Sequence, residues 1–213
     1  MFFKVNDHDI YAYTGGKAFD AAKPTAILIH GVLCDHSVWV LQSRYLANHG
    51  WNVLAIDLPG HCRSGGAAPQ TVEEAATFVG QLIDAAGLQQ AALIGHSWGS
   101  LIAMEAAATL KDRISHLVLV GTAFPMKVSP ALLESALNTP EQAITMVNTF
   151  SRATLSPPNG AGSWVFGAGM ALGRRVLASN TSTNLLHAGF TACDSYAGGE
   201  AAMAQITAPV LFV

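Results

Sequence analysis

A chain of 213 residues has room for one domain of moderate size with a substantial buried core. Hydrophobic residues make up 51% and charged residues 12%, about half the usual charged share, which suits a buried parallel sheet. The net charge is −3 and no block of Lys and Arg occurs, which argues against nucleic-acid binding. No segment resembles a membrane span or a signal peptide, so no membrane partner is expected. Three cysteines without paired spacing favour free thiols and a cytoplasmic protein.

The first half of the sequence alternates between apolar strands and helices. Residues 2–5 and 10–13 flank a polar turn and predict a β-hairpin, and the runs TAILIH, VLAID, AALIG and HLVLVG predict four buried strands. Helices are predicted over about 36–49, from the capping-box pair Thr71 and Glu74 to Gly87, and over SWGSLIAMEAAATL. This alternation predicts an α/β fold, with a mostly parallel central sheet and helices on both faces.

The alternation of strands and helices stops after Phe124, and the sequence pattern changes in the rest of the chain. Residues 125–200 show helical patches and joints rich in Gly, Pro and Ser, without a convincing buried strand. We therefore expect residues 1–124 to form the core, residues 125–200 a helical cap insertion, and residues 201–213 a return to the core through a helix turn and the strand APVLFV. The adjacent Arg174 and Arg175 are expected on a solvated helix face.

Gly95-His96-Ser97-Trp98-Gly99 is the motif that carries chemistry. It has the pattern G-x-S-x-G, with a predicted strand before it and an apolar helix after it. A turn this sharp strains the serine backbone, and the flanking glycines avoid clashes. The serine oxygen then projects near a helix N-terminus that favours negative charge, which makes Ser97 a candidate nucleophile. The plainer alternative is an ordinary serine in a strand–helix turn.

A second element, His30-Gly31-Val32, follows the strand TAILI. Acyl transfer needs two backbone N–H donors aimed at the oxyanion, and the expected donors are Trp98, next to the nucleophile, and Val32. Gly31 lets this loop turn without steric cost, and His30 and His96 are expected to shape the site. The alternative is that the His-Gly pair simply ends a strand.

These features resemble the α/β-hydrolase superfamily, in the branch of cofactor-free serine esterases with helical caps. The resemblance rests on His-Gly after one strand, DLPGHCRS after the next and GHSWG before a helix, and it covers essentially the whole chain. It implies that no metal or organic cofactor is used and that the segment from Asp57 to His61 is structural. Cys62 departs from the family pattern, which commonly has glycine, and is interpreted as tolerated loop variation.

The resemblance also implies a catalytic acid after the strand APVLFV and a histidine after one further strand, beyond Val213. We therefore expect a C-terminally truncated chain, with the last strand–helix units missing and with little activity alone. After Ser97 the histidines are His116 and His187; a rearranged pair of Ser97 with His187, assisted by Asp194, is the alternative arrangement.

The function that these features predict is hydrolysis of a carboxylic ester with a small apolar acyl group, through an acyl-serine intermediate. Phe124, Met126 and Trp164 are candidates for the substrate pocket, although they would serve equally to pack cap against core. The alternative is a non-catalytic ligand-binding or scaffold protein that kept the fold. Thioester, lactone and carbon–carbon bond substrates stay open, as does the oligomeric state.

Overall fold

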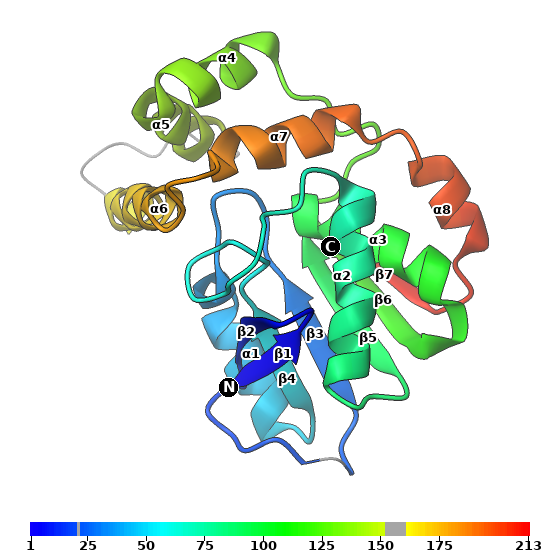
Figure 1. Ribbon diagram of the computed structural model, residues 1–213. Helices are drawn as coiled ribbons and strands as arrows, with labels where there is room; N and C mark the ends of the chain where they lie inside the picture. Colours follow the sequence, from blue (N-terminus) through cyan, green and yellow to red (C-terminus); the bar gives the residue numbers. More distant parts are fainter. Residues whose placement is uncertain (21, 152–160) are drawn as a thin grey trace.

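A central seven-stranded sheet organises the molecule in the computed structural model, which describes residues 1–20, 22–151 and 161–213, the side chains of residues 161–164 excepted (Figure 1). The strands are β1 (Phe2–Val5), β2 (His8–Tyr13), β3 (Thr25–Ile29), β4 (Asn52–Ile56), β5 (Ala91–His96), β6 (Ile114–Val120) and β7 (Val210–Phe212). Their order across the sheet is β1-β2-β4-β3-β5-β6-β7. The hairpin β1–β2 and the pair β2–β4 are antiparallel, and the other pairs are parallel. The predicted mixed, mostly parallel α/β sheet is therefore confirmed.

Helices connect the parallel strands, as right-handed crossovers require. Between β3 and β6 these are η1 (His36–Trp39), α1 (Val40–Asn48), α2 (Val72–Ala85), α3 (Trp98–Leu110) and η2 (Lys111–Arg113). The single helix predicted over 36–49 is therefore two segments, because Asp35 caps a short 3-10 turn through the Ser37 amide before the α-helix begins. The predicted cap of α2 is confirmed, since the Thr71 hydroxyl accepts from the Glu74 amide.

The inner strands β3 and β4 bury both of their faces, which is why they read as continuous apolar runs. On one face, Ile27, Ile29, Leu54 and Ile56 pack in the largest apolar cluster together with side chains of α2 and α3. On the other face, the alternate residues of the same strands pack with Trp39 and with Ala47 of α1. The sheet therefore forms the middle layer of a three-layer arrangement.

Among the residues that the structure describes between β6 and β7, the helices are α4 (Pro130–Asn138), α5 (Pro140–Phe150), α6 (Ala161–Ala178), α7 (Leu185–Ser195) and α8 (Gly199–Gln205). The first four lie together beyond the end of the sheet toward which the arrow of β3 points, whereas α8 packs beside α3 (Figure 1). A smaller apolar cluster joins α4, α5, α6 and α7 to Leu33, which follows β3. These helices therefore rest on the loops at the carboxyl ends of the strands.

The chain returns to the sheet in β7, which pairs with β6 in parallel. The side chains of Leu211 and Phe212 on this edge strand are more than half exposed, at 57% and 58%. Among the helices that the structure describes, none is long and apolar enough to cross a membrane.

Candidate active site

Ser97 occupies a sharp turn between β5 and α3. Its backbone has φ 53° and ψ −121°, a region that a non-glycine residue seldom enters. The turn is held on both sides, because the Ser97 amide donates to the Val120 carbonyl at 2.9 Å and the Ser100 amide donates to the Ser97 carbonyl at 2.8 Å. The strained conformation places the serine at the N-terminus of α3, at the carboxyl edge of the sheet.

Two glycines allow this turn to pack closely. A Cβ atom on Gly95 would collide with the carbonyl oxygen of Gly99, and a Cβ atom on Gly99 would collide with the carbonyl oxygens of Ile29 and His30. Neither position has space for a side chain. The G-x-S-x-G spacing is therefore required by contacts within the turn and between the turn and the end of β3.

The loop after β3 lies directly against the serine. A Cβ atom on Gly31 would stand 3.2 Å from the Cβ atom of Ser97 and 3.1 Å from the His96 ring. Among the hydrogen bonds of the residues that the structure describes, neither the Val32 amide nor the Trp98 amide donates to a protein acceptor. Among the described residues, the amide next to Ser97 in the chain and the amide that follows Gly31 thus have no protein acceptor.

His30 and His96 support these loops. The His30 ring is fully buried; its Nε2 atom accepts from the Leu58 amide at 3.2 Å, and its Nδ1 atom lies 2.9 Å from the Gly31 carbonyl. Burial lowers the pKa of His30, so the ring is neutral and can accept that bond. His96 packs edge-on to Trp39, and burial lowers its pKa as well. Both rings therefore act as packed structural groups.

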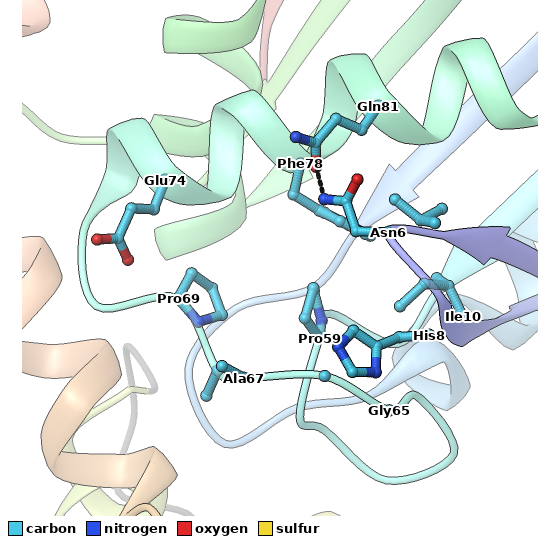
Figure 2. Close-up of a pocket in the computed structure, with 13 residues that line it drawn as sticks. Asn6, His8, Ile10, Pro59, Gly65, Ala67, Pro69, Glu74, Phe78 and Gln81 are labelled. Carbon is cyan, nitrogen blue, oxygen red and sulfur yellow. Dashed lines mark hydrogen bonds between the residues drawn. The ribbon is translucent and has the colours of Figure 1, made fainter.

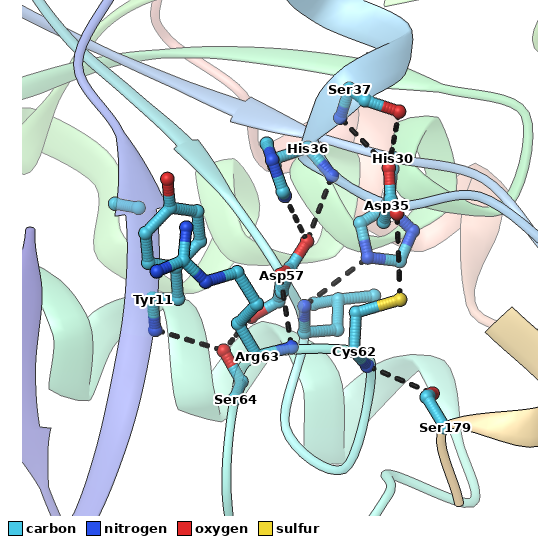
Figure 3. A network of polar contacts seen from close by, with 12 residues as sticks. Tyr11, His30, Asp35, His36, Ser37, Asp57, Cys62, Arg63, Ser64 and Ser179 are labelled. Atoms are coloured by element: carbon cyan, nitrogen blue, oxygen red, sulfur yellow. Dashed lines mark hydrogen bonds and ion pairs between the residues drawn. The ribbon is translucent and has the colours of Figure 1, made fainter. Parts of the chain in front are cut away.

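A buried network of charges joins the loops beside the site (Figure 3). Asp57, fully buried, accepts from the His36 amide at 2.8 Å and from the Arg63 amide at 3.2 Å, and it pairs with the His36 ring. The guanidinium of Arg63 stacks 3.7 Å from the centre of the Tyr11 ring. These contacts support the prediction that the Asp57 segment is structural.

Asp35 is the second buried carboxylate of this network, and no motif in the sequence indicates a role for it. It is 2% exposed and pairs with Arg175 of α6 at 2.7 Å. Arg174 does fit the predicted solvated helix face, since it pairs with the exposed Glu141, but Arg175 reaches a buried partner 140 positions away. Pairing over such a separation leaves no local sequence pattern.

The carboxylates could also be considered as metal ligands, because one ligand atom each from Asp35, His36 and Asp57 lies within 4.8 Å of the others. Each of these groups already has protein partners, however: Asp35 has Ser37 and Arg175, and Asp57 has the His36 ring. The carboxylate and imidazole atoms that could bind a metal are therefore already used in contacts that hold the loops together.

The thiol of Cys62 joins the same network. Its Sγ atom lies 3.4 Å from the Oδ2 atom of Asp35. Burial, together with the nearby carboxylates of Asp35 and Asp57, raises the pKa of Cys62 to about 12. The protonated thiol acts as a weak donor to Asp35, which makes it a poor nucleophile.

The three predicted pocket residues have different surroundings. Phe124 packs edge-on to Tyr196, with ring centres 5.8 Å apart, and a Cβ atom on Gly199 would collide with its ring. Met126 packs against the largest apolar cluster. The side chain of Trp164 lies outside the described residues. The contacts of Phe124 and Met126 are packing contacts, so their place in a substrate pocket stays a prediction.

The structure does not bring the alternative base to the serine. Asp194 accepts from the Val128 amide at 3.0 Å, and no hydrogen bond among the described residues joins it to the His187 ring or joins that ring to Ser97. His116 lies near the start of β6, whereas Ser97 follows the end of the neighbouring β5. Within the described chain, Ser97 therefore has no hydrogen-bonded imidazole.

A separate cavity of about 310 Å³ lies between the hairpin turn, the loop before α2 and α2 itself (Figure 2). Asn6 and Gln81 close one side of it through a 2.8 Å hydrogen bond. Phe78 and Pro59 supply apolar walls. None of the residues predicted for the active site lines this cavity, so it is distinct from the site around Ser97.

Comparison with known proteins gives matches consistent with this geometry. A family model described as "alpha/beta hydrolase fold" matches residues 24–166. Lipase LipV of Mycobacterium tuberculosis is 35% identical over 101 residues, which cover 47% of this chain and 38% of the lipase. Epoxide hydrolase B of the same organism is 32% identical over 108 residues, 49% of this chain and 30% of that enzyme. The chain thus matches less than two thirds of the length of these relatives.

Solved structures extend the likeness to the whole chain. Bromoperoxidase from Bacillus anthracis superposes with a TM-score of 0.80 at 17% identity, covering 100% of this chain and 79% of that chain. The enol-lactonase from Burkholderia xenovorans LB400 gives 0.78 at 22% identity, covering 100% and 80%. Identities this low show the fold alone. Because the family match covers more than half of the sequence, the chain belongs to the α/β-hydrolase fold family.

Proposed function

We propose that this chain carries the nucleophile and the oxyanion site of a serine hydrolase that cleaves carboxylic esters. Ser97 would attack the substrate carbonyl, and the amides of Val32 and Trp98 would hold the oxyanion of the tetrahedral intermediate. The observation that carries the proposal is the backbone of Ser97, at φ 53° in a turn packed against the loop after β3. Such strain is a cost to folding that a purely structural turn does not require.

The identity of the nucleophile supports ester chemistry over epoxide opening. Relatives of this chain include both a lipase and an epoxide hydrolase. Epoxide hydrolases of this fold use an aspartate as the nucleophile. In this chain, the middle residue of the turn between β5 and α3 is Ser97. A serine forms an acyl-enzyme with esters, so the lipase-like chemistry is favoured. Neither a metal nor an organic cofactor is needed for this reaction.

An apolar acyl group fits the surroundings of the oxyanion loop. Val32 and Leu33 pack against the apolar cluster formed by α4, α5, α6 and α7, which includes Ile144, Met170 and Leu186. We propose that residues 125–200 act as a cap and that this cluster borders the acyl pocket. A small apolar acyl chain would then be bound by desolvation of apolar surface.

The test is labelling with a fluorophosphonate probe, which reacts with activated serines. In a form of the protein that supplies a histidine base for Ser97, we expect labelling of the wild type and none of Ser97→Ala. Ser182→Ala is the matched control, because Ser182 is an exposed serine on the loop before α7 and should label as the wild type does. Equal labelling of the wild type and Ser97→Ala would end the proposal.

A non-catalytic ligand-binding role is the second candidate. It is favoured by one observation, that the described residues provide no hydrogen-bonded histidine for Ser97. For the same reason we expect the 213-residue chain alone to hydrolyse a simple aryl ester several orders of magnitude more slowly than an enzyme with a complete triad. Binding of an apolar ester without labelling or turnover, in a protein that has both acid and histidine, would favour this second role.

A further inference from the structure

Asp35 is a buried charge in the loop that carries Val32. It lies three residues after Val32, is 2% exposed and precedes the helical turn η1. The same loop contains Leu33, whose φ of 58° is unfavourable for a branched side chain. A loop with this conformation keeps it only where surrounding contacts hold it.

The carboxylate of Asp35 ties its own loop to the loop after β4 and to α6; Figure 3 shows its contacts with Ser37 and Cys62. Its Oδ1 atom accepts from the Ser37 amide at 2.9 Å and from the Ser37 hydroxyl at 2.6 Å. Its Oδ2 atom accepts from Arg175 Nη2 at 2.7 Å and Nε at 3.1 Å, and from the Cys62 thiol. Burial raises the pKa of Asp35, but these hydrogen bonds outweigh burial and lower it to about 2. The group is therefore charged at neutral pH.

Arg175 lies on α6, in the part of the chain that we propose to be the cap. The end of α6 and the segment after it also contact the core, since the Ser179 hydroxyl accepts from the Cys62 amide at 2.9 Å and Asn180 donates to the Gly60 carbonyl at 3.0 Å. These two contacts reach the loop after β4. The ion pair with Asp35 extends the attachment to the loop after β3, where Val32 lies.

The loop after β3 also contacts α7. A Cβ atom on Gly189 of α7 would approach the Val32 side chain to 2.9 Å. The Val32 side chain is thus packed against α7, and its loop is held by Arg175 of α6. The position of the Val32 amide therefore depends on where α6 and α7 sit.

We propose that Asp35 and Arg175 are positioning residues for the oxyanion site: their ion pair fixes the loop after β3 to α6 and so holds the Val32 amide in place. This inference rests on the proposed function. An oxyanion donor acts in the transition state, and a displacement of about 1 Å costs on the order of a hundredfold in rate. The pair therefore affects turnover while leaving substrate affinity in place.

The test compares two neighbouring arginines of α6 in the full protein. Arg175→Met removes the pair with Asp35, while Arg174→Met, the control, removes only the exposed pair with Glu141. We expect Arg175→Met to lower kcat for an aryl ester about tenfold with KM unchanged, and Arg174→Met to leave both unchanged. Arg175→Lys, which keeps the charge, should recover part of kcat.

Amide hydrogen exchange supplies a readout that does not need activity. We expect faster exchange over residues 31–37 in Arg175→Met than in Arg174→Met. Exchange should stay fast in the double variant Asp35→Asn/Arg175→Met, because the tether to α6 is still missing; recovery there would assign the effect to an unpaired buried carboxylate and would overturn the inference. Equal kcat and equal exchange in the two single variants would overturn the inference, as would a raised KM with unchanged kcat. Absence of Ser97-dependent labelling in the wild type would instead overturn the proposed function, and hydrogen exchange would still decide whether the pair holds the loop.

Discussion

At the scale of single residues, the loops around Ser97 contain three non-glycine residues with positive φ, Leu33, Cys62 and Ser97. They follow β3, β4 and β5, parallel strands that end at the same edge of the sheet. Left-handed backbone costs a non-glycine residue about 1–2 kcal/mol. At Ser97 the proposed nucleophile role accounts for this cost. At Cys62 it does not, since its thiol is protonated and donates a weak hydrogen bond to Asp35.

We therefore expect Cys62→Gly and Cys62→Ala to differ in stability. Both variants lose the thiol contact with Asp35, but only glycine relieves the backbone, which has φ 45° at this position. Cys62→Gly should exceed Cys62→Ala by about 1 kcal/mol in the free energy of unfolding. Urea denaturation measures the difference. Equal stability of the two variants would show that the backbone at Cys62 is not strained.

At the scale of elements, four of the described helical segments, η1, α2, α4 and α7, begin where a side chain accepts from a free amide. Thr71 and Glu74 form a reciprocal arrangement at α2: the Thr71 hydroxyl accepts from the Glu74 amide at 3.1 Å, and the Glu74 carboxylate accepts from the Gln70 amide at 2.7 Å. The sequence predicted the first of these bonds. The carboxylate reaches one residue further back than a standard capping box, because Gln70 precedes the cap.

Loss of this cap should be measurable. We expect Thr71→Ala to lower the free energy of unfolding by about 1 kcal/mol, because the Glu74 amide loses its acceptor. Thr77→Ala is the control on the same helix; Thr77 is exposed and bonds only the Glu73 carbonyl, so alanine there should leave stability unchanged or raise it slightly. A thermal melt that shows equal losses in both variants would contradict the capping role.

At the scale of the whole molecule, buried histidines couple stability to pH. His61 is 1% exposed and packs between His30 and Trp98. Burial, reinforced by the neighbouring His30, lowers the pKa of His61 to about 3 from 6.5. The unfolded chain takes up a proton below pH 6.5, whereas the folded protein does not until about pH 3. Stability is therefore complete above pH 6.5 and declines as the pH falls toward 3.

This gives a prediction for acid denaturation. Across the window from pH 6.5 to 3, His61 should contribute a loss of about 1.4 kcal/mol per pH unit to the free energy of unfolding. His61→Leu should have a shallower pH dependence in that window than the wild type. His49→Leu, at an exposed position, is the control and should keep the wild-type slope. The measurement is urea denaturation at a series of pH values; identical slopes in all three proteins would refute it.

The sequence by itself determined the parts of this protein whose physics is local. The run Ala91–His96, the glycines at 95 and 99 and the apolar helix after them define the turn at Ser97, because clashes within a few residues decide its shape. The order of strands and helices also followed from periodicity. Element bounds were less predictable, as the two helical segments within 36–49 show, because an Asp35 cap adds a 3-10 turn.

Only the tertiary structure decided which distant groups meet. Asp35 and Arg175 are 140 positions apart, and the sequence placed Arg175 on a solvated face because a charge pattern cannot show a buried partner on another element. The same limit applies to Phe124, which the fold packs against Tyr196 of the distant helical segment. The turn that presents the proposed nucleophile, Ser97, is thus a property of the local sequence. The position of the loop that faces it depends on the fold, because its contacts come from α6 and α7.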